Sequence, residues 1–472
     1  MRYFVLVIYM VLAWWPNQLF AQVEEQKQLT FEQFMTIVRT QHPVAKQAEL
    51  LIDQANSARR AARGSFDPEL FTDIQEKDLS GTDYFRLIES GLKIPTWFGV
   101  DIKAGYEQNR GVFLNPADFI PPAGLWFAEI KVPLGEGLFI DKRRAEVKKA
   151  ELFSKMNEET QKVTLNDLLY DSGTAYWEWF KSYNALSVYE NALELSQIRY
   201  DAVLEGADLG ERPAIDTLEA RIQVQNRQLN LQQAQLDYDN ATAQLSVFLW
   251  ANGIIPLEVE KGTVPPLLQS TPSTQVEDMY ISGIDTLIQG HPLLAQTQFK
   301  IDQLRVDVRL KKEELKPTLN LSYKPITEPV GGDVFSQFSS NNFEWGLEFS
   351  LPIFLRKERG NIKLAQLKVR DNELEFANKQ ENLLLKARKA INEWSTSYQQ
   401  IDQFEVAVDN YSRLLQGEQR KFETGESSLF LVNSRETSLI TAQVKLVDLY
   451  TKNGKASLKT KHAFGRLEQI YR

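Results

Sequence analysis

The sequence predicts a mainly α-helical protein with a β-barrel portion, built from two copies of one unit. Two observations lead to this prediction. The segment around Arg144 recurs around Arg359, 215 positions later, and the same shift places Gly210 on Gly425. In addition, proline is absent from 134 to 212, which permits a helix of unusual length. Repeated segments that diverge in composition but keep their length must be matched as rigid rods.

Residues 1–21 have the features of a secretory signal peptide, with Arg2 before an apolar run and Ala21 at the predicted cleavage site. The alternative is a single N-terminal membrane anchor. The run is shorter than the ~20 apolar residues that a spanning helix needs, and Pro16 interrupts it. No later apolar stretch approaches that length. If the exported chain enters a membrane, it must therefore do so as a closed barrel, which leaves no backbone group unpaired in lipid.

Composition excludes several functions. The 472 residues carry a formal net charge of −9 without a block of Lys or Arg, so no nucleic-acid partner is expected. The absence of Cys excludes disulfides and thiolate metal sites. Because no phosphate loop or catalytic set is present, we expect neither an enzyme nor a cofactor. His42 and His291 precede Pro at predicted helix starts, where a structural role is expected, and His462 is expected to be inert near an exposed C-terminus.

The first repeat is predicted to span 22–250. Helices over 29–63 precede four extended segments, at 66–76, 84–94, 98–108 and 124–134. A long hairpin follows over 141–250, with its tip at 205–213. Its first helix, over 141–204, would be ~95 Å long at 1.5 Å per residue. In its returning helix, apolar residues fall seven apart, as a coiled-coil seam requires: Ile222, Leu229, Leu236 and Ala243.

A proline-containing segment over 251–280 is predicted to link the two repeats across the middle of the molecule. The second repeat spans 281–465. It has strands between 317 and 352 and a long hairpin over 357–461, with its tip at 423–427. The two repeats thus share one order: short helix, strands, long helix, glycine-containing turn and returning helix.

The extended segments alternate apolar and polar residues. In one matched pair, Trp126 and Ile130 alternate with Glu129 and Lys131; in the other, the apolar positions begin at Trp345. This pattern suits barrel strands with lipid outside and water inside, with both tryptophans in the aromatic belt at the membrane surface. The alternative, an ordinary half-buried sheet, has the same period of two. The predicted lumen residues are Glu129, Lys131, Glu344 and Glu348.

Together these features resemble the TolC-type outer-membrane efflux factors, over about residues 29–465. The resemblance depends on paired elements in the same order in both halves: His-Pro helix starts at 42–43 and 291–292, strand entries at Pro68 and Pro317, and strand exits at 132–134 and 351–353. It implies a homotrimer with a periplasmic helical tunnel that continues into a shared outer-membrane barrel of about twelve strands, four per protomer. The segments at 84–108 exceed that count, and we interpret them as an accessory hairpin, although an even number of added strands would also permit a larger barrel.

The resemblance further implies a passive conduit of a tripartite efflux or secretion system, located in the outer membrane and extending into the periplasm. Its partners would be outer-membrane lipid, a periplasmic adaptor (membrane fusion) protein and an inner-membrane transporter. The alternative is a periplasmic coiled-coil scaffold without a pore. An envelope enzyme with a helical stalk is disfavoured because the sequence lacks a catalytic set. The cargo is not readable from the sequence.

In the resembling family, polar contacts near the hairpin turns close the periplasmic mouth, and adaptors dock at the tips. Asp216 matches an acidic position that takes part in that closure, whereas Leu431 and Ser434 stand where some members carry two acids. The acidic ring is expected to have moved to Asp216 and Glu219 of the first hairpin. The predicted gate and tip residues are Gly210, Glu211, Arg212, Asp216, Glu219, Gly425, Glu426, Ser434 and Arg435. The alternative for the charged residues of this set is that they are solvated side chains on helix ends.

Overall fold

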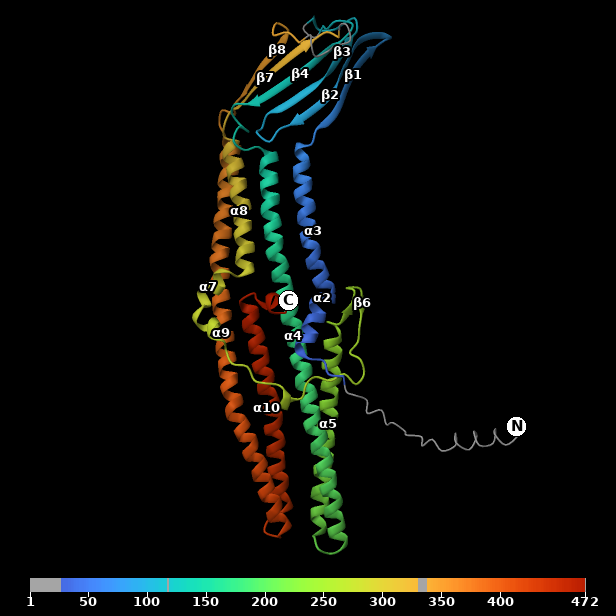
Figure 1. The fold of residues 1–472 in the computed structure, drawn as a ribbon, viewed down its shortest axis with the longest axis vertical. Helices are drawn as coiled ribbons and strands as arrows, with labels where there is room; N and C mark the ends of the chain where they lie inside the picture. Colours follow the sequence, from blue (N-terminus) through green and yellow to red (C-terminus); the bar gives the residue numbers. More distant parts are fainter. Residues whose placement is uncertain (1–26, 117–118, 330–337, 472) are drawn as a thin grey trace, which may run out of the picture.

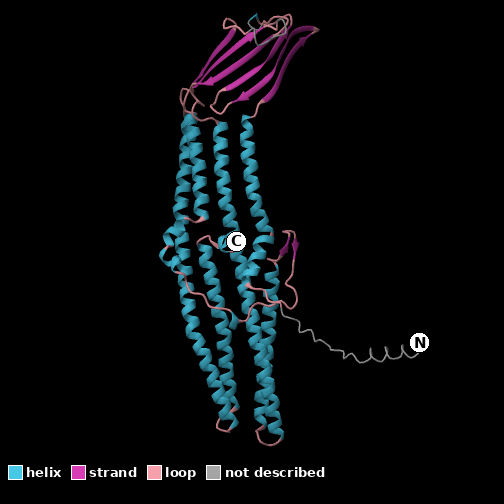
Figure 2. Cartoon of the chain, in the orientation of Figure 1, coloured by secondary structure: helices cyan, strands magenta, loops and turns pink. Residues whose placement is uncertain are grey.

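A computed structural model describes residues 27–116, 119–329 and 338–471. The predicted signal peptide at 1–21 lies outside these residues. The chain is elongated, with one β-sheet at one end and helices running away from it to two hairpin tips at the other (Figure 1). Helices dominate, and in the part of the chain that the structure describes the strands lie in the terminal sheet and a small lateral pair (Figure 2). The predicted class, mainly helical with an antiparallel sheet, is confirmed.

The helices that lead to the sheet begin at side-chain caps. In α2 (Phe31–Gln41), Thr30 and Gln33 form a capping box. Both α3 (Pro43–Arg63) and α8 (Pro292–Glu313) have Pro at the first position and His at the N-cap. His42 Nδ1 accepts from the backbone N–H of Val44 at 3.2 Å, and His291 Nδ1 accepts from that of Leu293 at 3.0 Å. The structural role expected for these two histidines is confirmed.

Within the described residues, the sheet is a single antiparallel layer of six strands in the order β1-β2-β3-β4-β7-β8. The strands are β1 (Glu69–Leu79), β2 (Thr82–Pro95), β3 (Asp101–Arg110), β4 (Leu125–Pro133), β7 (Thr318–Thr327) and β8 (Phe343–Ser350). The accessory interpretation of residues 84–108 is wrong: β2 and β3 lie between β1 and β4 in continuous register. A hairpin inserted as an up–down pair reverses direction twice, so it extends the antiparallel order without disturbing its neighbours.

Two long hairpins form the shaft. The first pairs α4 (Lys142–Asp208) with α5 (Ala214–Ser246), and the second pairs α9 (Arg356–Glu423) with α10 (Leu429–Ala463). At 1.5 Å per residue α4 is about 100 Å long. No helix within the described residues combines the length and the apolar character needed to span a bilayer.

Short elements surround the middle of the shaft. The connecting segment contains the paired strands β5 (Trp250–Ala251) and β6 (Ile255–Pro256), the turn η4 (Leu268–Ser270), and the helices α6 (Asp278–Ser282) and α7 (Ile284–Gln289). The helix α11 (Leu467–Ile470) packs against α4, and Leu467 is fully buried. The prediction for His462 was therefore wrong in its setting. Its Nε2 lies 2.7 Å from Asp167 Oδ1 and its ring stacks on Tyr170, because the last turn of α10 packs against α4.

The aromatic core lies at this waist. Trp179 of α4 is fully buried and donates to Thr242 Oγ1 of α5 at 3.1 Å. Trp394 of α9 is 1% exposed and donates to the carbonyl of Thr274 at 2.7 Å. Both indole N–H groups are thus satisfied, as burial of a tryptophan requires. The two large buried apolar clusters of the shaft contain these tryptophans, whereas a much smaller cluster of Val203, Ala220 and Leu429 joins the two hairpins near their tips.

The seam of the first hairpin differs from the prediction. The residues of α5 that are buried against its neighbours also fall seven apart, but two positions earlier: Ala220, Arg227, Ala234 and Ala241. Leu229 is 63% exposed and Leu236 is 52% exposed in the single chain. Alanine allows the close approach of α5 to α4, and the larger apolar residues form a stripe on the outward side.

Candidate channel wall and hairpin tips

The sheet has an apolar face and a polar face, and its register fixes which residues share each. One row across the apolar face runs Ile94, Ile102, Ile130, Tyr323 and Trp345. Other residues of the apolar face are Leu70, Ile74, Ile88, Leu92, Trp126, Leu321, Leu347 and Phe349. Trp345 is 63% exposed and Leu70 is 84% exposed. An apolar surface of this extent marks a contact with a membrane or another protein.

The polar face carries alternating charges linked across strands. Lys131 Nζ lies 3.2 Å from Glu348 Oε2, and Lys103 Nζ lies 3.7 Å from Glu129 Oε2. Lys324 pairs with Glu107 at 2.7 Å and with Glu344 at 3.9 Å. The residues predicted for the lumen, Glu129, Lys131, Glu344 and Glu348, therefore lie together on this face. The predicted belt residues Trp126 and Trp345 lie together on the opposite face.

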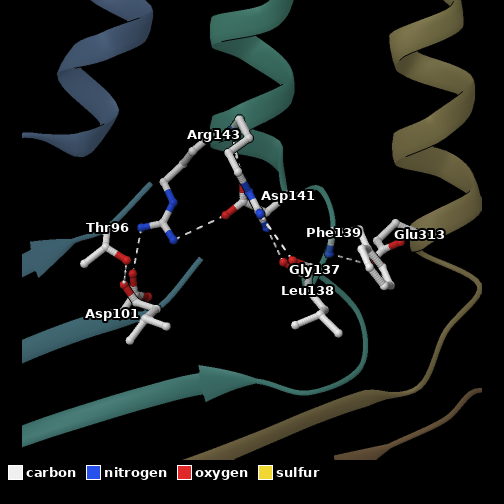
Figure 3. Close-up of polar contacts among 10 residues, drawn as sticks. Thr96, Asp101, Gly137, Leu138, Phe139, Asp141, Arg143 and Glu313 are labelled. Carbon is white, nitrogen blue, oxygen red and sulfur yellow. Dashed lines mark hydrogen bonds and ion pairs between the residues drawn. The ribbon is translucent and has the colours of Figure 1, made fainter. Parts of the chain in front are cut away.

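A polar junction joins the sheet to the start of α4 (Figure 3). Asp141 caps the helix by accepting from the backbone N–H of Arg144 at 2.8 Å. Arg143 donates to Asp101 Oδ1 at 2.8 Å and to Asp141 Oδ2 at 3.4 Å. Because Asp101 begins β3, this arginine ties the β2–β3 turn to the helix. The sequence alone gave no reason to expect this contact.

The same junction fixes the chain between β4 and α4. Arg144 donates to the carbonyl oxygens of Gly137 and Leu138, and Glu313 of α8 accepts from the backbone N–H of Phe139 at 3.1 Å. Figure 3 shows these contacts converging on the loop before Asp141. The link to Glu313 joins the first repeat to the second.

At the far end, Gly210 and Gly425 occupy the tips of the two hairpins in matching conformations. Their φ angles are +74° and +79°, in the left-handed region that favours glycine at the end of a helix. The backbone N–H of Glu211 bonds to Gly206 at 2.9 Å, and that of Glu426 bonds to Lys421 at 2.8 Å. The predicted equivalence of the two turns is confirmed at the level of individual hydrogen bonds.

Some predicted tip residues contact one another across the hairpins. The Arg212 guanidinium lies 4.1 Å from the centroid of the Phe422 ring, which joins the first tip to the second. Glu219 accepts from Asn433 at 3.0 Å. Arg435 pairs with Glu418 at 3.6 Å. These contacts connect the two hairpins or the helices within one hairpin, so part of the predicted set is brought together.

Other predicted residues have no such contact. Within the described part of the chain, the side chains of Glu211, Asp216, Glu426 and Ser434 make no hydrogen bond or ion pair. Asp216 lies in the first turn of α5 and is partly exposed. Near Arg435, a hydrogen bond from Ser427 holds the pKa of the Glu418 carboxyl below its usual value, with further help from Lys421 and Arg435.

Sequence reasoning missed a buried polar cluster near the tips. Arg199 of α4 donates to both carboxylate oxygens of Glu436 of α10, at 2.6 and 3.3 Å. Arg227 of α5 donates to Thr437 at 2.8 Å, and burial lowers the pKa of Arg227. Glu436 is 3% exposed and Arg227 is 4% exposed. The one available signal was Arg227 itself, seven residues from both Ala220 and Ala234 in the seam.

The family model for outer membrane efflux proteins matches residues 131–249 and 283–463. No curated protein sequence matches the chain. Among solved structures, the CmeC outer membrane channel of Campylobacter jejuni is similar with a TM-score of 0.64 at 14% identity, covering 92% of this chain and 85% of that one.

Two further structures show the same fold. VceC from Vibrio cholerae gives a TM-score of 0.64 at 14% identity, over 92% of this chain and 96% of that one. The open state of the Neisseria gonorrhoeae MtrE channel gives 0.67 at 13% identity, over 92% and 88%. The two blocks matched by the family model cover well over half of the chain and contain both long hairpins. The chain therefore belongs to the outer membrane efflux protein family.

Proposed function

We propose that this outer-membrane efflux channel acts as a passive homotrimeric conduit that begins in the periplasm and crosses the outer membrane. The observation that carries the proposal is a two-faced sheet mounted on helices of about 100 Å. A charged face opposite an apolar face suits a water-filled lumen within lipid. The long helices are polar on much of their surface, which suits a tunnel wall wetted on both sides.

The exposed stripe on α5 supports association of protomers. Ile222, Leu229 and Leu236 lie on its outward side, and α9 has exposed leucines along its upper half, among them Leu364, Leu367 and Leu374. Side chains of this kind are normally covered in a stable complex. Packing of these helices against neighbouring protomers would complete the tunnel wall.

The tips are the proposed site of opening. Asp216, Glu219 and Arg435 would lie where three protomers converge, and Asp216, whose side chain makes no hydrogen bond or ion pair within the described residues, would pair with the next protomer. A periplasmic adaptor, together with an inner-membrane transporter, would dock at the turns of Gly210 and Gly425 and replace these contacts. The conduit requires neither a cofactor nor catalysis.

Purified protein reconstituted in planar bilayers tests the proposal. We expect material extracted from the outer membrane to migrate as a heat-modifiable trimer and to produce discrete conductance steps. A scaffold without a pore would give no steps. Recovery of a monomer in the soluble periplasmic fraction would reject both the trimer and the conduit.

A further inference from the structure

The inserted hairpin β2–β3 lies in the middle of the sheet. It separates β1 from β4, which would otherwise be neighbours, and pairs with each of them over most of its length. Among the described residues, the first repeat therefore contributes four strands to the sheet and the second contributes two. The added strands are an integral part of the wall that each protomer presents.

The two faces continue without interruption across the insertion. On the apolar face, Leu92 stands between Leu70 and Ala104, and on the polar face Lys93 stands between Glu69 and Lys103. A hairpin lying in water outside a barrel would not need one apolar face in register with its neighbours. The pattern places β2 and β3 in the same two environments as the other four strands.

Glycines in the insertion permit curvature. Gly91 of β2 and Gly105 of β3 face each other, and a Cβ on either would collide with the backbone of the opposite strand. Facing glycines of this kind allow a sheet to bend sharply, as closure into a barrel requires. On the polar side Phe127 covers Gly105.

The turn of the insertion is fastened to the shaft. Arg143 of α4 bonds to Asp101 directly after the turn, and the Trp97 ring lies 5.1 Å from that of Phe66, in the short turn after α3. Thr96 Oγ1 donates to the carbonyl of Val100 at 2.6 Å and closes the turn. The insertion thus has a fixed position above the helices, as Figure 3 shows at Thr96 and Asp101.

The described sheet ends in two edges, β1 and β8, that have no neighbouring strand within the chain. Such long edges are covered in stable proteins. Strand β1 leaves the helices and β8 returns to them, so the β8 edge of one copy is antiparallel to the β1 edge of the next (Figure 1). The occupant that fits both edges at once is a second copy of this chain.

From these observations we propose that three copies close a barrel of 18 strands, six from each copy, through β8–β1 pairing. This inference depends on the trimer of the proposed function. The resemblance to the family had implied twelve strands. Since barrel diameter grows roughly linearly with strand number, the 18-stranded wall encloses about twice the cross-section.

The circumference of the helical shaft in a trimer matches that of an 18-stranded barrel. Four helices per chain, α3, α4, α8 and α9, lie below the sheet, which makes twelve in a trimer. At about 10 Å per helix, twelve helices form a ring of about 120 Å. Strands about 4.8 Å apart and tilted by about 40° give a circumference of about 110 Å for 18 strands and about 75 Å for twelve. The larger barrel continues the tunnel without a constriction.

Cysteine cross-linking tests the edges, because the chain contains no cysteine. Glu348→Cys in β8 is combined in turn with Phe71→Cys, Asp73→Cys or Gln75→Cys in β1, all on the polar face. Oxidation in outer-membrane vesicles should give covalent trimers for at least one pair. The matched control, Glu348→Cys with Lys103→Cys in β3, should give none. Cross-linking of the control pair alone, or of no pair in intact trimers, would overturn the inference.

Electron cryomicroscopy of the intact trimer in nanodiscs tests the strand number. We expect 18 strands, and twelve after excision of residues 80–124, which joins β1 directly to β4. Twelve strands in the full-length trimer, with β2–β3 outside the wall, would reject the inference while leaving the conduit intact. If the unmodified protein formed no trimer, that result would instead reject the proposed function.

Discussion

The carboxylate of Glu436 is the only acid in contact with Arg199 among the described residues, and Arg227 lies in the same buried cluster. An ion pair withdrawn from water gains little over apolar packing, but loss of one partner leaves an uncompensated charge. The cluster therefore makes the arrangement of α4, α5 and α10 near the tips sensitive to a single side chain.

Glu436→Gln is expected to destabilise the folded protein by about 3 kcal/mol, because both arginines lose their counter-ion. Thermal unfolding of the purified trimer measures the change. The control is Glu426→Gln at the exposed second tip, expected to cost less than about 0.5 kcal/mol. Equal melting temperatures for the two variants would show that the buried pair does not stabilise the shaft.

Asp216 offers a test of the gate. Its side chain has no partner within the described chain, so a role in closure requires contacts with another protomer. We expect Asp216→Ala to raise single-channel conductance in planar bilayers without changing thermal stability. Asp208→Ala, at the end of α4, is the control. Unchanged closure in Asp216→Ala would remove this residue from the gate.

His291 predicts a pH dependence. Burial, reinforced by the nearby His462, lowers the pKa of His291 to about 4 from 6.5. Below pH 6.5 the unfolded chain takes up a proton that the folded chain does not, so stability falls as the pH drops from 6.5 towards 4. At pH 5 the loss relative to pH 7 is about 2 kcal/mol.

His291→Asn removes the titrating ring and keeps a side chain that can cap α8. The difference in melting temperature between pH 7 and pH 5 should be smaller in this variant than in the unmodified protein. If the melting temperatures of the two proteins changed equally with pH, His291 would take up its proton as readily in the folded chain as in the unfolded chain.

At the scale of elements, the two stripes of α5 predict opposite effects. Ala234 is 6% exposed in the seam with its neighbours, whereas Leu229 is 63% exposed on the outward stripe. Ala234→Leu should overpack the hairpin and cost about 1–3 kcal/mol of folding stability. Leu229→Ala should leave the hairpin folded but lower the temperature at which the trimer dissociates.

Circular dichroism reports on the helices, and unheated gel migration reports on the trimer. The two readouts should separate the variants. If Leu229→Ala left trimer dissociation unchanged, the outward stripe would not be a contact between protomers.

The lengths of the elements were the most predictable part of this fold. Absence of proline between Pro133 and Pro213 predicted the rod that became α4, and the recurring glycines predicted both turns. The seam was not predictable from hydrophobicity, because alanine at 220 and 234 carries a weaker signal than leucine at 229 and 236. Close packing of helices selects small residues, and an amphipathic pattern cannot tell contact within a chain from contact between chains.

Long-range contacts were also beyond sequence reasoning. Arg199 and Glu436 are 237 positions apart, and a charged residue on a helix ordinarily faces water. Likewise, period-two alternation identified β2 and β3 as strands but contains no information on which strand each would join. Strand order depends on pairing across the whole sheet.

At the scale of the whole molecule, the apolar face predicts how the sheet meets lipid. Ile88 lies on the apolar face and Glu89, its neighbour in β2, lies on the polar face. Ile88→Lys should destabilise the membrane-inserted trimer by about 2–4 kcal/mol, the cost of a lysine near the middle of the bilayer. Glu89→Lys, facing water, should cost far less.

Unfolding in urea in the presence of lipid vesicles measures both changes. Equal tolerance of lysine at the two positions would show that β2 does not face lipid. That result would also contradict the barrel of 18 strands.

The buried tryptophans at the waist make this packed region a pivot for the long helices. Trp179 and Trp394 are buried in the apolar core of the waist, and the helices α4 and α9 that carry them continue uninterrupted in both directions. A rotation about this fulcrum too small to disturb its packing is magnified with distance from it. The tips at Gly210 and Gly425, at the far ends of the rods, therefore move farther in such a rotation than the buried tryptophans do.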